Sequence, residues 1–259
     1  MKISEYLHSE LSSESLSHKD AIASCFDRVA DQLLRKCLVI LDDRTYLLSE
    51  IEFYYYSDIH QDPYVHRHPN QLKTGLWYFH NVGQDLTFGR DGSYGGILIR
   101  GITSTDRSHF ADGPVKTFEE LFNKELAIDD RHVFRVKFSE EPLIPGEQKM
   151  YSFPRVGLYP QGREHDEAYF FKRYRYLSHP WLTRAERHVI YLYLKYIDKQ
   201  EVEWEEKFRV DKSMIRDYEQ AFFKGRTISR AEAENILSGK PNMNVLNKCR
   251  LLGWYANNR

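Results

Sequence analysis

The sequence has few cysteines and no long apolar run. Its three cysteines, Cys25, Cys37 and Cys249, are scattered, and none belongs to a C-x-x-C pair. This usage argues against a disulfide framework or a thiolate metal site and is typical of reduced cytosolic thiols. No stretch approaches the roughly 18 consecutive apolar residues of a membrane span, and the opening "MKISEYLHSELSSES" lacks the apolar centre of a signal peptide. We therefore expect a cytoplasmic protein that has no membrane partner.

Net charge is also small, −1 at pH 7, but the charged side chains are unevenly distributed. Residues 1–145 carry 16 basic and 23 acidic side chains, whereas residues 146–259 carry 21 and 15. Such a bias permits a basic face on the second part of the chain, although a solvated surface without a partner has the same composition.

Hydrophobic periodicity predicts a mixed first part. Apolar residues at helical spacing predict a helix over 20–37, with Asp20 as its N-cap, and a hairpin of two strands follows over 37–56. Residues 57–75 contain Asp, His, Pro, Asn and Gly and are typical of a loop. Further strands are predicted at 75–79, 85–89, 95–102, 132–138, 155–159 and 168–177, and a second helix at 116–128.

The pattern becomes helical after residue 182. Thr183 and Glu186 have the spacing of a capping box, and Ser229 and Glu232 repeat it. We therefore expect an α+β protein with three parts: a polar N-terminal segment (1–21), one mixed domain (22–182) and a helical C-terminal extension (183–259).

The stretch "LLSEIEFYYY" places two glutamates inside an apolar, aromatic strand. Strand side chains alternate between faces. One predicted face carries both acids and two phenols: Leu48, Glu50, Glu52, Tyr54 and Tyr56. The other face is predicted to lie on the core: Leu47, Ser49, Ile51, Phe53 and Tyr55. A buried carboxylate must be paired or used, although an isolated Glu-x-Glu on an edge strand usually faces solvent.

This strand resembles the Glu-Thr-Glu-Ala-Tyr strand of the alkyladenine (3-methyladenine) DNA glycosylase family. In that family an acid and a histidine follow, as Asp62 and His66 do here. Four further segments occur in the family's order: "ILIRGI" ending near Arg100, "DGPVKTFEELFNKELAI", "PRVGL" and "YFFKRYRYLSHPW". The resemblance covers residues 22–182.

The resemblance implies a curved antiparallel sheet flanked by helices, related to the formyltransferase C-terminal barrel. It implies a monofunctional DNA glycosylase of base-excision repair, which flips a damaged base out of double-stranded DNA and needs no cofactor. By position, Glu52 matches the glutamate that activates water, and Arg100 matches the arginine that helps to hold that water. Tyr54 and His66 match pocket walls. Counting back from Arg100 without gaps matches Trp77 to a third wall, His80 to the wedge in the duplex, and Thr87 to the position that screens against guanine.

Several features depart from the family. His66 comes about three residues later, the loop after it is shorter, and "HNVGQ" replaces the family's Tyr-Gly wedge segment. The alternative is a non-catalytic descendant of the same fold that binds nucleic acid, or a protein partner through its C-terminal helices. Arg100 is then a structural ion-pair partner.

Two other segments contain residue types that can bind phosphate or a metal ion. Basic groups interleaved with aromatic rings predict a phosphate-binding strand, with Lys172, Arg173 and Arg175 as candidates, although such rings are as often core. Metal-capable residues gather in "SDIHQDPYVHRH", but their spacing matches no ligand pattern, so no metal site is expected.

Overall fold

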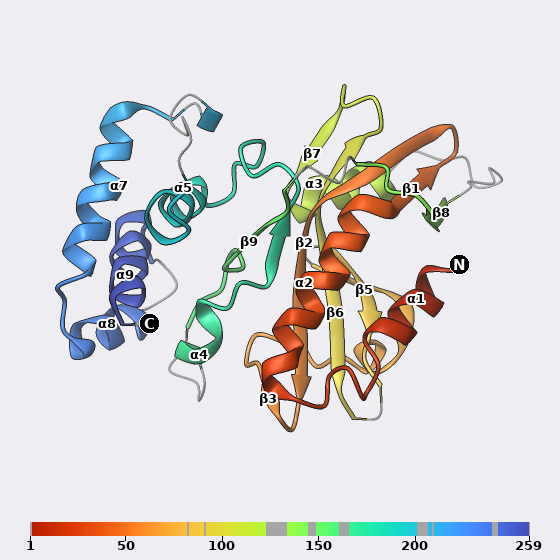
Figure 1. Cartoon of the computed structure of the whole chain (residues 1–259), viewed down its shortest axis with the longest axis horizontal. Helices are drawn as coiled ribbons and strands as arrows, with labels where there is room; N and C mark the ends of the chain where they lie inside the picture. The colour runs from red at the N-terminus through yellow and green to blue at the C-terminus, as the bar shows by residue number, and fades with distance from the viewer. Residues whose placement is uncertain are drawn as a thin grey trace. The chain divides into compact units, whose positions relative to one another are not determined.

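The chain divides into two compact units (Figure 1). Residues 1–152 and 173–179 form the sheet unit, and residues 153–172 and 180–259 form the helical unit. Residues 153–172, which we expected in the mixed domain, therefore group with the helices. The computed structural model describes residues 2–81, 83–90, 92–122, 134–144, 149–160, 166–200, 207–208, 210–239 and 243–258.

The sheet unit is built on a curved antiparallel half-barrel, and the protein is mixed α+β, as predicted. The main path of the ten-stranded sheet runs β4-β5-β6-β2-β1-β8, with β3 and β10 paired to β2, β7 to β6, and β9 to β10. The strands are β1 (Cys37–Leu41), β2 (Arg44–Ser57), β3 (His60–Gln61), β4 (Thr74–His80), β5 (Gly83–Phe88), β6 (Tyr94–Ser104), β7 (Phe110–Asp112), β8 (Phe134–Phe138), β9 (Tyr151–Phe153) and β10 (Arg175–Leu177).

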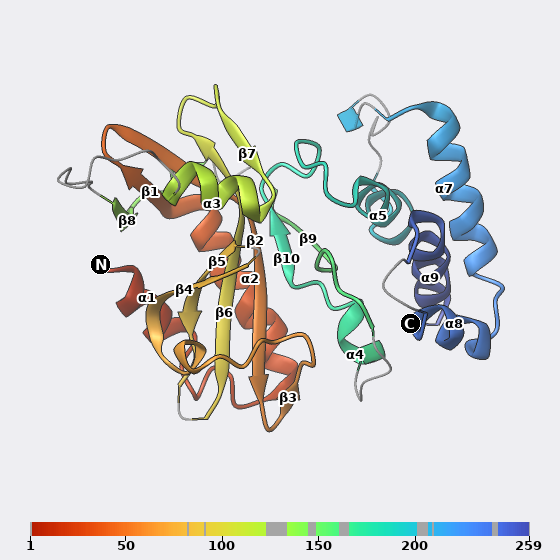
Figure 2. The same ribbon diagram turned by 180° about the vertical axis from the view of Figure 1, so that it is seen from behind.

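In the described residues of this unit, three α-helices and a short 3-10 helix, η1 (Pro69–Leu72), accompany the sheet. Helix α2 (Lys19–Lys36) confirms the predicted helix, but it begins one residue after His18, so Asp20 is not its N-cap. Helix α1 (Ile3–Glu10) packs on β4 within the segment expected to be polar, and it buries Leu7 completely. Helix α3 (Pro114–Phe122) packs on β5, β6 and β7 (Figure 2) and begins the predicted second helix, whose remainder lies outside the described residues.

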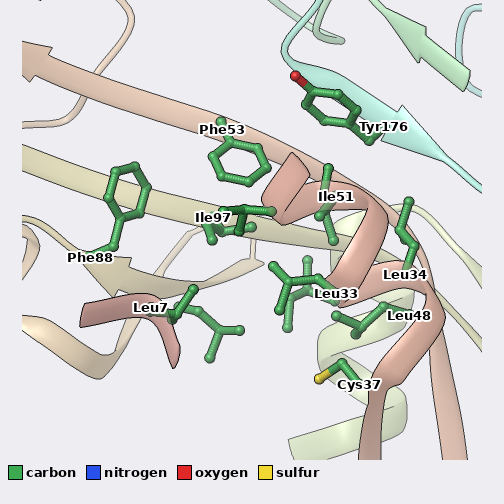
Figure 3. Packing of buried hydrophobic residues seen from close by; sticks show 14 of the residues in the cluster. Leu7, Leu33, Leu34, Cys37, Leu48, Ile51, Phe53, Phe88, Ile97 and Tyr176 are labelled. Atoms are coloured by element: carbon green, nitrogen blue, oxygen red, sulfur yellow. The ribbon is translucent and has the colours of Figure 1, made fainter. Parts of the chain in front are cut away.

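The core lies between α2 and one face of the sheet. Leu33 and Leu34 of α2 pack in one cluster with Ile51 and Phe53 of β2 (Figure 3). Ile97 of β6 completes the contact. Burying each of these side chains contributes about 1.5–3 kcal/mol, so this face fixes which side of β2 is apolar.

Strand β2 changes face at a bulge. Its pairing with β6 shifts between Leu48 and Glu50 and again between Glu50 and Ile51. As a result Leu48 lies in the same core cluster as Ile51 and Phe53. Strict alternation therefore describes Glu50 to Tyr56 but assigns Leu48 to the wrong face, because a bulge inserts one unpaired residue.

Two predicted strands after residue 150 are wrong. Residues 155–159 form a turn and extended chain, and residues 168–177 divide between helix α4 (Asp166–Phe170) and β10. Tyr169, Phe170 and Phe171 are all buried. A strand with one buried face cannot bury three consecutive side chains.

The helical unit contains α5 (Arg187–Leu192), a π-helical turn η2 (Tyr193–Ile197), α7 (Lys212–Gly225), α8 (Arg230–Leu237) and α9 (Val245–Asn257). The predicted cap of α8 is confirmed, because Ser229 Oγ accepts a hydrogen bond from the Glu232 amide at 3.2 Å. The predicted box at Thr183 is wrong: Glu186 adopts a left-handed conformation and pairs with Lys248. Within the described ranges, no helix combines the length and hydropathy of a membrane span.

Helices α7 and α9 meet through glycines, which leads to a stability prediction. A Cβ atom at Gly253 would lie 1.9 Å from the Phe222 carbonyl oxygen, and one at Gly225 would lie 1.9 Å from that of Arg250. Gly253→Ala should therefore lower the free energy of unfolding by about 3 kcal/mol, although alanine is otherwise the better helix former by about 1 kcal/mol.

Urea denaturation measures this change, with Lys224→Ala, at an exposed position of α7, as the matched control. Gain of stability in Gly253→Ala would contradict the close approach of the two helices.

Candidate functional site

The face of β2 that points away from α2 carries the acidic side chains. Beyond the bulge, Ile51 and Phe53 point into the core, so Glu52 and Tyr54 point to the opposite face. Strand β6 pairs with one side of β2 and places Arg100 beside the acids, while β10 pairs with the other side and places Arg175 there.

These side chains form a buried ion cluster. Arg100 Nε lies 2.7 Å from Glu50 Oε1 and 3.4 Å from Glu52 Oε1, and Arg175 Nε lies 2.8 Å from Glu50 Oε1. The Tyr54 hydroxyl donates a hydrogen bond to Glu52 Oε2 at 2.8 Å. Exposed fractions are 1% for Glu50, 0% for Glu52, 6% for Arg100 and 0% for Arg175. The solvent-facing position that an isolated Glu-x-Glu suggests is therefore wrong for both acids.

The carboxylates and guanidinium groups of this cluster stabilise one another's charged forms. Burial alone would raise the pKa of Glu50, but the guanidinium groups of Arg175 and Arg100 outweigh it, so the pKa is lowered. Burial would lower the pKa of Arg100, and the carboxylates of Glu52 and Glu50 raise it instead. Glu50 and Arg100 are therefore both charged at neutral pH.

A second polar group, the histidine cluster, consists of His66, His68, Tyr78, His80 and Asp85. His80 Nε2 lies 3.1 Å from Asp85 Oδ1, and the ring centroids of His66 and His80 are 4.9 Å apart. The Tyr78 hydroxyl lies 3.4 Å from His66 Nδ1, and the His68 ring stacks on Tyr78 at 4.5 Å. Across the described chain, no three His, Cys, Asp or Glu side chains are arranged to hold a metal ion.

Strand register places both clusters on one face. Asp85 pairs with Leu98, and Leu98 pairs with Glu52. Directly paired residues of antiparallel strands share a face, and two strand spacings amount to about 10 Å. Gly96 lies on the same face, and its lack of a side chain leaves the space that the side chains of Asp85 and Gln71 occupy. A Cβ atom there would lie 2.5 Å from Asp85 Oδ2 and 2.9 Å from Gln71 Nε2.

The environment of His66 predicts a pH dependence. Partial burial, with His80 and His68 nearby, lowers its pKa below 6.5, against the opposing charge of Asp85. The pKa of His66 is lower in the folded state than in the unfolded state, so between these two pKa values the unfolded chain binds more protons. The free energy of unfolding should therefore fall as pH drops below about 6.5. NMR titration of the imidazole measures the pKa directly, and His66→Asn should remove this part of the dependence. A midpoint at or above 6.5 would contradict it.

Of the residues chosen from the sequence, Glu52, Tyr54 and Arg100 lie together. His66 and His80 lie in the histidine cluster of the same face, but the His80 side chain is buried against Asp85 and does not project as a wedge.

The two remaining positions of the ungapped match are differently placed. Trp77 pairs with Leu86 and packs against the core cluster, on the opposite face, so it is not a wall of this site. Thr87 is buried, and its hydroxyl bonds to the Leu76 amide and carbonyl at 2.9 and 3.0 Å. Its side chain therefore stabilises the irregular β4–β5 pairing.

The three basic residues chosen for phosphate binding do not share one environment. Arg175 is fully buried and pairs with Glu50, so its guanidinium is not available to a phosphate, and that prediction is wrong. Arg173 Nε donates to the Ser152 carbonyl at 3.0 Å, within the sheet unit. Lys172 belongs to the helical unit.

The sequence reasoning missed Tyr78, Asp85 and Gln71. Gln71 Nε2 donates to Asp85 Oδ2 at 3.1 Å, and both side chains are buried. A signal existed, since Asp85 is an acid at the start of the strand "DLTFG", and a carboxylate in a strand needs a partner as Glu52 does.

Comparisons with known proteins do not indicate an activity. No family model matches the sequence. The chain is similar to "Uncharacterized protein L759" of Acanthamoeba polyphaga mimivirus, with 28% identity over 180 residues, which covers 54% of this chain and 82% of that protein.

Proposed function

We propose that the protein is a monofunctional DNA glycosylase that hydrolyses the N-glycosidic bond of a flipped, damaged or modified base. The observation that supports this most is the position of Glu52, whose two carboxylate oxygens face the Tyr54 hydroxyl and the Arg100 guanidinium. The curved antiparallel sheet is also the architecture that the resemblance to alkyladenine DNA glycosylases implies.

Three side chains of the ion cluster have roles in this chemistry. As the bond between C1′ and the base nitrogen breaks, its electron pair leaves with the base, and positive charge develops on the sugar. Glu52 stabilises that charge and accepts a proton from the water whose oxygen attacks C1′. Arg100 helps to orient the water, and the Tyr54 ring stacks on the base, a contact of about 1–3 kcal/mol.

Glu50 has a different role from Glu52. It lies between Arg100 and Arg175 and holds both guanidinium groups. Glu50 is therefore a positioning residue, which fixes the side chain that faces the water.

A non-catalytic nucleic-acid- or protein-binding descendant is the second candidate. Glu52 has no exposed surface, and a water-activating base must be reached by water and by the sugar. The enzyme proposal therefore requires the neighbouring side chains to open when DNA binds.

A base-release assay separates the two candidates. The full chain is incubated in excess with duplexes that contain hypoxanthine, ethenoadenine or 3-methyladenine, and abasic sites are revealed by alkali. Release of one base, with the strand intact until alkali is added, is the expected result. Absence of release from all three would favour the non-catalytic candidate. Duplex affinity at rising salt then separates a nucleic-acid binder, whose affinity falls steeply, from a protein binder.

A further inference from the structure

A cavity of about 280 Å³ lies in the sheet unit, apart from the ion cluster. It is lined by the segment that joins α1 to α2, by the end of β2 with the turn after it, and by residues around the end of β5. This volume is close to the lower end of the range for small-molecule sites, about 300–1,000 Å³.

The floor of the cavity is apolar. Tyr55 and Phe88 stack with ring centroids 5.8 Å apart and an interplanar angle of 22°. Both are almost completely buried, as is Leu11 beside them. A ring or a branched chain of a ligand would find an apolar, preformed contact here.

Arg90 gives one wall of the cavity a positive charge. Its Nη2 donates to the His8 carbonyl at 3.0 Å, which holds the side chain beside the other lining residues. The carboxylate of a ligand would meet this guanidinium favourably.

The cavity also carries a charge of the opposite sign. Asp58 lies in its lining and is exposed, and no ion pair joins it to Arg90 or to another side chain that the structure describes. A purely anionic ligand would meet Arg90 favourably and Asp58 unfavourably. A ligand that carries both charges meets both residues favourably.

We propose that this cavity binds a small zwitterion with an apolar body, of the chemical class of aromatic or branched amino acids. The carboxylate lies at the Arg90 guanidinium, the ammonium lies at Asp58, and the apolar body rests on Tyr55 and Phe88. This assignment does not depend on the proposed glycosylase function.

Three probes with one phenyl ring separate the two charges. L-Phenylalanine carries both, 3-phenylpropionate lacks the ammonium, and 2-phenylethylamine lacks the carboxylate. Calorimetric titration of the full chain with each probe, up to about 10 mM because small ligands bind weakly, should show saturable binding of L-phenylalanine and at least tenfold weaker binding of the others. Equal binding of 3-phenylpropionate would overturn the zwitterion, and no saturable binding of any probe would overturn the site.

Substitutions locate the binding. Arg90→Leu and Asp58→Asn should each weaken L-phenylalanine binding about tenfold to hundredfold, while Arg135→Leu, at an exposed position of β8 outside the lining, should not change it. Because Arg90 also holds the His8 carbonyl, Arg90→Lys, which keeps the positive charge, should lose less affinity than Arg90→Leu. Unchanged affinity in both Asp58→Asn and Arg90→Leu would overturn the proposal.

Discussion

Replacing Glu50 with leucine is expected to lower the free energy of unfolding by about 3–5 kcal/mol, the usual effect of breaking a buried ion pair. Glu50 Oε1 accepts from Arg100 Nε at 2.7 Å and from Arg175 Nε at 2.8 Å. Leucine fills a similar volume but leaves two buried guanidinium groups with one carboxylate, Glu52, in place of two. The uncompensated charge, rather than lost packing, produces the effect.

A double variant separates charge from packing. In Glu50→Leu with Arg175→Met, the second substitution removes the guanidinium that lost its partner, so stability should recover by several kcal/mol relative to Glu50→Leu alone. The matched control is the exposed pair of Arg28 and Glu10, whose side chains are 54% and 33% exposed at 3.2 Å. Glu10→Leu should change stability by less than about 1 kcal/mol. Chemical denaturation of all four proteins at pH 7 measures these differences.

Acid should reproduce the effect of the substitution. The pKa of Glu50 is lowered below its ordinary value of 4.5 in the folded state, because its two arginines outweigh the effect of burial. The stability it contributes is therefore present above pH 4.5 and is lost as pH falls through the folded pKa. If wild type and Glu50→Leu lost stability equally between neutral pH and pH 3, the pairing of Glu50 would be contradicted.

The sequence predicted the structure correctly where the structure depends on residues close together along the chain. The apolar spacing in "DAIASCFDRVADQLLRKC" predicted α2 because that helix has a single buried face. Strand alternation placed Glu52 and Tyr54 on one face, and they bond to each other two residues apart; their choice as site residues came from the family resemblance. The helix and the shared face both follow from neighbours along the chain.

Errors arose where register decided the outcome. A shift of one residue moves a strand side chain to the other face. The bulge near Ser49 put Leu48 in the core, and the ungapped match chose Trp77 where Tyr78 faces the polar side. Arg175 was assigned to phosphate because its partner, Glu50, lies 125 positions away in the sequence, a distance over which spacing carries no information.

Replacing Glu52 with glutamine is expected to reduce single-turnover base release by about 10²–10⁴, the usual contribution of a positioned general base. Glutamine keeps the shape of the side chain but cannot accept the proton of the attacking water. Arg100 and Arg175 both keep Glu50, their nearer partner at 2.7 and 2.8 Å, whereas Glu52 contacts Arg100 only at 3.4 Å, so Glu52→Gln should lose less stability than Glu50→Leu. Duplex affinity should stay close to that of the wild type, because the carboxylate contacts no phosphate in this mechanism.

Two comparison variants distinguish loss of the base from a disturbed site. Tyr54→Phe keeps the stacking ring and removes only the 2.8 Å hydrogen bond to Glu52, so it should lose far less than Glu52→Gln. Glu50→Gln acts through the positions of Arg100 and Arg175, so any loss of rate should accompany a loss of stability. Glu50 Oε1 already accepts from both Arg100 and Arg175, so Glu50 is expected to hold the arginines rather than to take the proton of the water. Equal loss of rate in Glu50→Gln and Glu52→Gln, with both proteins folded at the assay temperature, would show that Glu52 is not the general base of this reaction.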